Sequence, residues 1–162
     1  VHTLKAALAQ VPALDPATIE DAIVGCAFPE AEQGLNVARM AVLLAGLPQS
    51  VGGVTVNRYC ASGLESIAIA TAKIRSGQSD CIIAGGTESM SLVPTAGWKT
   101  VPAYSIASEE PDYYLSMGLT AEAVAREYNV SREDQDRFSY ESHLKAGNAI
   151  KNGFFKEGIE DK

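Results

Sequence analysis

The sequence predicts an α/β protein, with helices on both faces of a sheet that is mixed or wholly parallel. Three apolar runs of strand length, at 22–28, 54–57 and 81–84, alternate with two helical stretches, at 37–45 and 61–76. The connections between them are short, and strand–helix–strand units of this kind pack their helices on a sheet. The runs contain few polar residues, as expected of strands that are covered on both faces.

Residues that commonly begin or end helices stand at the borders of these segments. Apolar residues recur at helical spacing over 4–11, so we expect the chain to begin within a helix. Asp15 before Pro16 is typical of a short helical turn, and Gly46 and Gly77 end the two longer helices. The helix 61–76 carries a row of larger side chains on one face, at Leu64, Ile67, Thr71 and Ile74.

The second part of the chain has a different character. Residues 92–116 hold three prolines and several tyrosines with no sustained period, which indicates a long, ordered excursion without regular elements. Because no strand pattern follows it, we expect two domains. Residues 1–91 would form the α/β core, and 92–162 would begin a mainly helical loop or lid domain.

Two helix starts are expected in this second part. Thr120 is positioned to cap a helix that continues through Tyr128. Ser131, with Asp134 three residues later, predicts a second and more polar helix that runs to about Asn152.

The composition excludes several classes of function. The chain has 162 residues, 46% of them hydrophobic, and a net charge of -7, which would repel nucleic acids and anionic membranes. An anionic small molecule stays compatible, because a few local cations outweigh a distant net charge. No window reaches the roughly 18 apolar residues of a membrane span, and we expect no signal peptide.

The three cysteines, Cys26, Cys60 and Cys81, are too few and too irregularly spaced for a disulfide framework or a zinc site. We therefore expect reduced thiols, and no metal site is predicted. Cys26 and Cys81 lie within apolar strand patterns, which favours structural roles for both.

Cys60 differs from the other two because it lies between a predicted strand and the start of a predicted helix. There, unpaired amide donors and the helix dipole favour negative charge, and so favour the reactive thiolate. The same donors can stabilise an oxyanion. Most free cysteines are nevertheless small buried hydrophobes, so the pattern alone leaves both a catalytic and a structural role open.

Three segments of the chain resemble a known family. Residues 57–67, Asn-Arg-Tyr-Cys-Ala-Ser-Gly-Leu-Glu-Ser-Ile, resemble the active-site segment of thiolases, in wording closest to the degradative 3-ketoacyl-CoA thiolases. Residues 85–91, Gly-Gly-Thr-Glu-Ser-Met-Ser, resemble their second signature. Residues 117–122, Met-Gly-Leu-Thr-Ala-Glu, with 131–136, Ser-Arg-Glu-Asp-Gln-Asp, resemble the opening of their loop domain.

The resemblance implies one half of a duplicated, layered thiolase fold and an acyltransferase activity. Cys60 would attack a 3-ketoacyl-CoA, expel acetyl-CoA and hold the shortened acyl group as a thioester for free CoA to remove. The reverse condensation would use the same site. The Cys60 N–H would contribute to an oxyanion hole, and Met117 would line the pocket for the acyl or pantetheine end. No bound cofactor is expected, since coenzyme A acts as a substrate.

Other residues near these motifs are expected to support the site. Glu88, Ser89 and Met90 follow a strand end, and we interpret them as structural support. Arg58 is expected to pair with a nearby carboxylate or to stiffen the turn. His143 falls on a predicted polar helix face, so we do not expect it to be catalytic.

The sequence also departs from the family pattern. The activating histidine of a Gly-His-Pro motif and the second cysteine of a Cys-x-Gly motif have no counterpart here. Both belong to the C-terminal half of the family fold, and the first strand is missing too. We therefore expect an incomplete portion of a thiolase that is inactive alone. The alternatives are a ketoacyl-synthase-type condensing enzyme and a non-catalytic, thiolase-like binding or scaffold protein.

The expected partners follow from the same resemblance. They are acyl-CoA and CoA, in a pathway such as fatty acid β-oxidation, and further copies of the chain in a homodimer or homotetramer. A bacterial cytoplasm is the expected compartment, with mitochondria and peroxisomes as alternatives.

Overall fold

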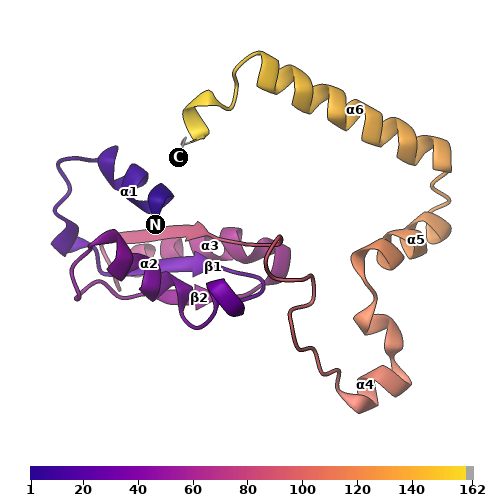
Figure 1. The fold of residues 1–162 in the computed structure, drawn as a ribbon, viewed down its shortest axis with the longest axis horizontal. Coiled ribbons are helices and arrows are strands. Elements are labelled where there is room, and N and C mark those ends of the chain that lie inside the picture. Colours follow the sequence, from indigo (N-terminus) through magenta and orange to yellow (C-terminus); the bar gives the residue numbers. More distant parts are fainter. Residues whose placement is uncertain (160–162) are drawn as a thin grey trace. The chain divides into compact units, whose positions relative to one another are not determined.

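A computed structural model describes residues 1–159 (Figure 1). The chain forms two compact units, of which the first comprises Val1–Thr100 and the second begins at Val101. The last residues of the first unit pack on it, because Val93 is fully buried and the Glu30 carboxylate accepts a hydrogen bond from the Trp98 N–H at 2.7 Å.

The first unit is built on a three-stranded sheet in the order β2-β1-β3. The strands are β1 (Asp21–Gly25), β2 (Val54–Val56) and β3 (Ile82–Gly86), and both pairings are parallel. Their carboxyl ends lie in register, with Gly25 opposite both Val56 and Gly86. The α/β architecture predicted from the strand and helix pattern is confirmed.

The first strand is shorter than its apolar run, which extends to Phe28. It ends at Gly25, because the N–H groups of Ala27 and Phe28 turn to the carboxylate of Glu88 instead of a neighbouring strand. The N–H of Cys26 still bonds to the Val56 carbonyl at 2.9 Å. The predicted end of this strand at residue 28 is therefore wrong by three residues.

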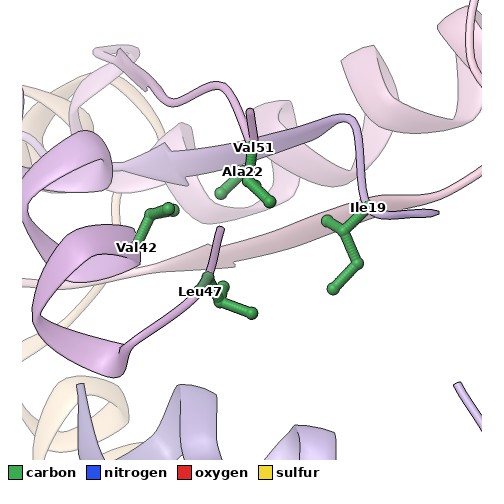
Figure 2. Close-up of a cluster of buried hydrophobic side chains, with 5 residues drawn as sticks. All are labelled: Ile19, Ala22, Val42, Leu47 and Val51. Atoms are coloured by element: carbon green, nitrogen blue, oxygen red, sulfur yellow. The ribbon is translucent and has the colours of Figure 1, made fainter. Parts of the chain in front are cut away.

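Helices cover both faces of the sheet, with α2 (Val37–Ala45) and α3 (Ser62–Arg75) on opposite sides (Figure 1). The helix α1 (His2–Ala9) packs Leu4 and Leu8 on the same core as α2. That core joins Ala22 of β1 and Val42 of α2 to residues of the connecting segments (Figure 2). Its buried members are Ile19, Ala22, Val42, Leu47 and Val51.

The helix α3 meets the sheet with its small residues. Ser62, Ser66 and Ala70 are buried, whereas Leu64 is 71% exposed and Ile67 is 51% exposed. A Cβ atom on Gly25 would lie 2.3 Å from the backbone of Ser62, so strand and helix are almost in backbone contact here. Such an approach admits only small side chains, which explains why the row of larger side chains faces away from the sheet.

The second unit contains only helices and turns among the residues described. Its helices are α4 (Tyr104–Glu109), α5 (Met117–Glu127) and α6 (Arg132–Lys151). Short 3-10 turns occur in both units, at Pro16–Thr18, Ala31–Gln33, Tyr59–Ala61, Pro111–Tyr114 and Lys156–Gly158. The segment 92–116 thus holds a short helix that its irregular sequence did not predict.

The two predicted helix starts in this unit have different outcomes. Ser131 caps α6 as expected, and its hydroxyl accepts a hydrogen bond from the Asp134 N–H at 3.1 Å. The prediction that Thr120 caps the preceding helix is wrong. Ser116 is the cap of α5, and Thr120 lies within the helix, where its hydroxyl donates to the Ser116 carbonyl at 3.0 Å.

Candidate active site

The carboxyl ends of the three strands meet at one edge of the sheet, where parallel α/β proteins bind ligands. The segment after β1 begins at Cys26, the segment after β2 contains Cys60, and the segment after β3 contains Glu88. Hydrogen bonds join these three segments to one another. The candidate site is therefore one connected structure rather than three separate loops.

Cys60 lies in the middle of the 3-10 turn Tyr59–Ala61. This turn ends directly before Ser62, the first residue of α3. Cys60 is exposed, whereas the alternative of a small structural hydrophobe would require a buried side chain. The helix α3 has no side-chain N-cap. None of the hydrogen bonds found within residues 1–159 occupies the Cys60 N–H. A thiol and an amide donor thus lie together at a helix start, where negative charge is favoured.

The turn that presents Cys60 has a backbone conformation rarely adopted by residues other than glycine. Tyr59, the residue before it, has a φ of 47°, in the left-handed region. The side chain of Asn57 accepts a hydrogen bond from the Tyr59 N–H at 2.9 Å and donates one to the Ala27 carbonyl at 2.9 Å. The strained residue is therefore held by a side chain that also reaches the segment after β1.

Ser62 closes the same turn from its other end. Its hydroxyl donates to the Tyr59 carbonyl at 2.6 Å and accepts from the Arg58 N–H at 2.9 Å. Arg58 in turn pairs with Glu65 of α3, with 2.8 Å between Nε and a carboxylate oxygen. The expected pairing of Arg58 with a nearby carboxylate is confirmed, and it links the turn to the helix it precedes.

Glu88 binds the segment after β1. Its carboxylate accepts hydrogen bonds from the N–H of Ala27 at 2.7 Å, from the N–H of Phe28 at 3.4 Å and from the side-chain amide of Gln33 at 2.5 Å. Gln33 is 4% exposed, and its amide oxygen is buried without a partner among the residues described. Through Glu88, the segment after β3 is therefore bound to the segment after β1.

The other two cysteines have different surroundings. Cys26 is fully buried, with its sulfur 3.8 Å from a carboxylate oxygen of Glu88. Burial raises the pKa of the Cys26 thiol, and the negative charge of Glu88 raises it further. Cys81 is half-buried against the hydrophobic core. The burial of Cys26 agrees with the expected structural role of this residue, because a buried thiol with a raised pKa is a poor nucleophile. Cys81 packs against the core, which agrees with the same expectation.

The remaining residues named from the sequence belong to the second unit. Met117 is the first residue of α5 and is 71% exposed. His143 lies on α6 and is exposed, as its polar neighbours predicted.

Sequence reasoning did not identify the role of Asn57. A signal for it was present, because an asparagine two residues before a turn residue commonly accepts that residue's N–H and stabilises a left-handed conformation. The bond from Asn57 to the Ala27 carbonyl had no comparable signal, since these residues are 30 positions apart.

Two negative findings complete the description. Within residues 1–159, no three His, Cys, Asp or Glu side chains gather as a metal ion would require. No described helix combines the length and the apolar composition that crossing a bilayer demands.

Comparison with known proteins identifies the family. The family model described as the thiolase N-terminal domain matches residues 1–160. A 3-ketoacyl-CoA thiolase of Bacillus subtilis is 57% identical over 141 residues, which cover 87% of this chain and 36% of that protein. One from Pseudoalteromonas translucida is 45% identical over 159 residues, or 98% of this chain and 40% of that protein.

A further relative has a different named substrate. The 3-oxoadipyl-CoA/3-oxo-5,6-dehydrosuberyl-CoA thiolase of Escherichia coli is 42% identical over 172 aligned residues, which cover 96% of this chain and 43% of that protein. The chain thus spans 36% to 43% of the length of these three relatives. The family match covers nearly all of this chain, including the carboxyl ends of the three strands and the turn around Cys60. The chain therefore belongs to the thiolase family.

Proposed function

We propose that this chain provides the acyl-accepting cysteine of a 3-ketoacyl-CoA thiolase, and that this cysteine is Cys60. The observation that carries the proposal is the exposed thiol of Cys60 just before α3, beside its own N–H, which none of the hydrogen bonds found within residues 1–159 occupies. It lies in a chain whose match to the thiolase N-terminal domain includes this turn. The full-length protein would transfer acyl groups between 3-ketoacyl-CoA and CoA.

The proposed reaction has two halves. The Cys60 thiolate attacks the C3 carbonyl carbon of the substrate, and the bond between C2 and C3 breaks with its electron pair passing to C2. C2 then takes a proton and departs as the methyl group of acetyl-CoA. The acyl group left on Cys60 as a thioester is attacked by the deprotonated thiol of CoA, and Cys60 leaves as a thiolate. Covalent catalysis divides one difficult cleavage into two easier steps.

The geometry suits the charge that develops in both steps. Each attack places negative charge on a carbonyl oxygen, and the N–H of Cys60 lies beside the sulfur that makes or breaks the bond. A well-placed oxyanion donor contributes roughly a hundredfold to a thousandfold in rate. The base that removes the thiol proton would be the histidine implied by the resemblance, in a motif absent from residues 1–162. The activity is therefore proposed for the full-length protein.

Several further assignments belong to the same proposal. The core predicted as residues 1–91 is followed by residues 92–100, which pack on the same unit. The rest of the predicted segment 92–162 opens the loop domain, in which Met117 lines the acyl or pantetheine pocket. The protein works without a bound cofactor, as a homodimer or homotetramer in a bacterial cytoplasm. Its named relatives include thiolases for 3-ketoacyl-CoA and for 3-oxoadipyl-CoA, and the most similar of the three favours the first substrate class.

Mass spectrometry of the full-length protein tests the assignment of Cys60. After incubation with acetoacetyl-CoA, we expect one acetyl adduct that maps to Cys60. In light scattering, we expect the mass of two or four copies of the full-length protein. The adduct should persist in Cys26→Ser and disappear in Cys60→Ser. No adduct on the folded wild-type protein would favour a non-catalytic binding role, and an equal adduct at Cys26 would refute the choice of nucleophile.

A further inference from the structure

We propose that Asn57 is a positioning residue for Cys60, which fixes the turn that presents the thiol and ties it to the segment after β1. The inference rests on the proposed role of Cys60 and extends it to a residue that makes no contact with the reacting atoms.

The residue directly before Cys60 has a strained backbone conformation. Tyr59 has a φ of 47°, and a residue with a side chain adopts this left-handed conformation at an energetic cost. The Asn57 carbonyl oxygen accepts the Tyr59 N–H at 2.9 Å, which offsets that cost locally. Without this bond, Tyr59 is expected to relax towards the ordinary helical or extended regions. Rotation about its backbone would redirect both the thiol and the N–H of Cys60.

The other end of the Asn57 side chain binds the segment after β1. Its amide group donates to the Ala27 carbonyl at 2.9 Å, and the Ala27 N–H donates to the Glu88 carboxylate at 2.7 Å. The segments after β1, β2 and β3 are thereby linked in one hydrogen-bonded series. Asn57 is the link in the series that belongs to the turn of Cys60, so the position of that turn against the sheet edge depends on it.

The expected effect is on the chemical steps and not on substrate binding. Displacement of a reacting atom by about 1 Å lowers a rate by up to roughly a hundredfold. Contacts with the CoA portion of the substrate do not involve Asn57 in this proposal. Loss of the side chain should therefore lower kcat far more than it alters KM.

The chain offers a matched control in Asn36. Its side chain also donates to a backbone carbonyl, that of Gly53 at 2.7 Å, and accepts a backbone N–H, that of Arg39 at 3.2 Å. It caps α2 and makes no hydrogen bond to the turn of Cys60. Asn36 also accepts a hydrogen bond from the Thr55 hydroxyl at 2.9 Å, so Asn36→Ala removes one bond more than Asn57→Ala from the same unit. It therefore measures the effect of a structural loss outside the turn.

The experiment compares full-length wild type with Asn57→Ala, Asn57→Ser and Asn36→Ala. Two quantities are measured: kcat and KM with acetoacetyl-CoA and CoA, and the rate of iodoacetamide alkylation of Cys60 relative to Cys81 across pH. Serine keeps an oxygen that can accept the Tyr59 N–H, but it cannot reach Ala27 in the same way. It is also the second variant should the alanine variant fail to fold.

We expect Asn57→Ala to lower kcat by about tenfold to a hundredfold, with KM within about twofold of wild type. Alkylation of Cys60 should fall while that of Cys81 does not, Asn57→Ser should be intermediate, and Asn36→Ala should match wild type in both readouts. Equal losses in Asn57→Ala and Asn36→Ala, or wild-type behaviour of both Asn57 variants, would overturn the proposal.

These outcomes are separate from a failure of the proposed function. If wild-type Cys60 formed no acyl adduct, the role of Cys60 in catalysis would be refuted. The relative alkylation rates of Cys60 and Cys81 would still decide whether Asn57 controls the turn.

Discussion

The segments that follow β1 and β2 begin alike and end differently. Each leaves the same edge of the sheet and each carries a cysteine, Cys26 directly after β1 and Cys60 four residues after β2. Behind β1 the chain stays irregular, and its N–H groups are taken by the Glu88 carboxylate. Behind β2 the chain forms a tight turn and enters α3, whose first amide donors point back towards that turn.

The difference shows that two cysteines at the same end of a sheet can have opposite surroundings. The Glu88 carboxylate lies beside the buried thiol of Cys26. Burial raises the pKa of this thiol, and the negative charge of Glu88 raises it further. Cys60 is exposed and lies just before the start of a helix, where backbone N–H donors favour negative charge. The two cysteines differ in what lies beside them, which is the Glu88 carboxylate for Cys26 and a helix start for Cys60.

The largest expected effect comes from the glycine on which α3 rests. A methyl group added at Gly25 would lie 2.3 Å from the backbone of Ser62, and neither backbone can yield. Gly25→Ala should lower the free energy of unfolding by about 3 kcal/mol, measured by denaturant titration. Because the strain falls at the start of α3, alkylation of Cys60 should change as well, while that of Cys81 should not.

Gly85 provides the control for this substitution. It lies on β3, and a Cβ atom built there has no neighbour within 4 Å. Gly85→Ala should therefore change stability by no more than about 0.5 kcal/mol. If both variants lost the same stability, the close approach of β1 and α3 would not be what limits residue 25.

A smaller effect is expected from Glu88→Gln, which keeps the size of the side chain and removes its charge. Bonds from N–H groups to a neutral acceptor are weaker, so stability at neutral pH should fall by about 1 kcal/mol. Without the charge, the pKa of the Cys26 thiol should move down towards its ordinary value, although burial continues to raise it. At high pH, a thiol reagent should therefore label Cys26 faster in folded Glu88→Gln than in the folded wild type.

The sign of the pH dependence follows from the same shift. A thiol whose pKa is higher in the folded than in the unfolded protein contributes fully to stability below the unfolded pKa. That contribution is lost as the pH rises through the folded pKa, which places the loss in the alkaline range. Stability of the wild type should fall there more than that of Glu88→Gln or Cys26→Ala. An identical alkaline decline in all three proteins would exclude Cys26 as its cause.

The smallest effect is expected at the ion pair between Arg58 and Glu65. The Arg58 side chain is 64% exposed, and exposed pairs contribute little because water and salt screen them. Arg58→Ala should cost about 0.5 kcal/mol or less, measured in a double-mutant cycle with Glu65→Ala. A coupling energy well above 1 kcal/mol would show that the pair, and not Asn57 and Ser62, holds the turn.

Local patterns predicted much of this molecule, because the relevant interactions are local. The capping of α6 by Ser131 was predictable, since the hydroxyl and the N–H it binds are three residues apart. The same reasoning failed at α5, which begins earlier than predicted, with Ser116 and not Thr120 as its cap. A shift of the start by about one helical turn does not show in the pattern, because it leaves the apolar spacing of the helix unchanged.

The covered face of α3 was beyond such reasoning for a different reason. Leu64 and Ile67 form a regular apolar row, yet the sheet receives Ser62 and Ser66. The choice depends on Gly25, which lies on another element and permits the backbones to approach closely. Periodicity identifies the two faces of a helix, but the partner element determines which face it accepts.

The hydrogen bonds around Cys60 also bear on how the protein folds. The motif from Asn57 to Gly63 is continuous in sequence, but the bonds that orient it reach Ala27, 30 residues earlier, and Ala27 reaches Glu88, 61 residues later. Contacts of such separation form only after long loops have closed. The orientation of the segment around Cys60 is therefore expected to form late in folding. A short peptide with the same letters would carry the thiol without its orientation, and a nascent chain would acquire it only once β3 has joined the sheet.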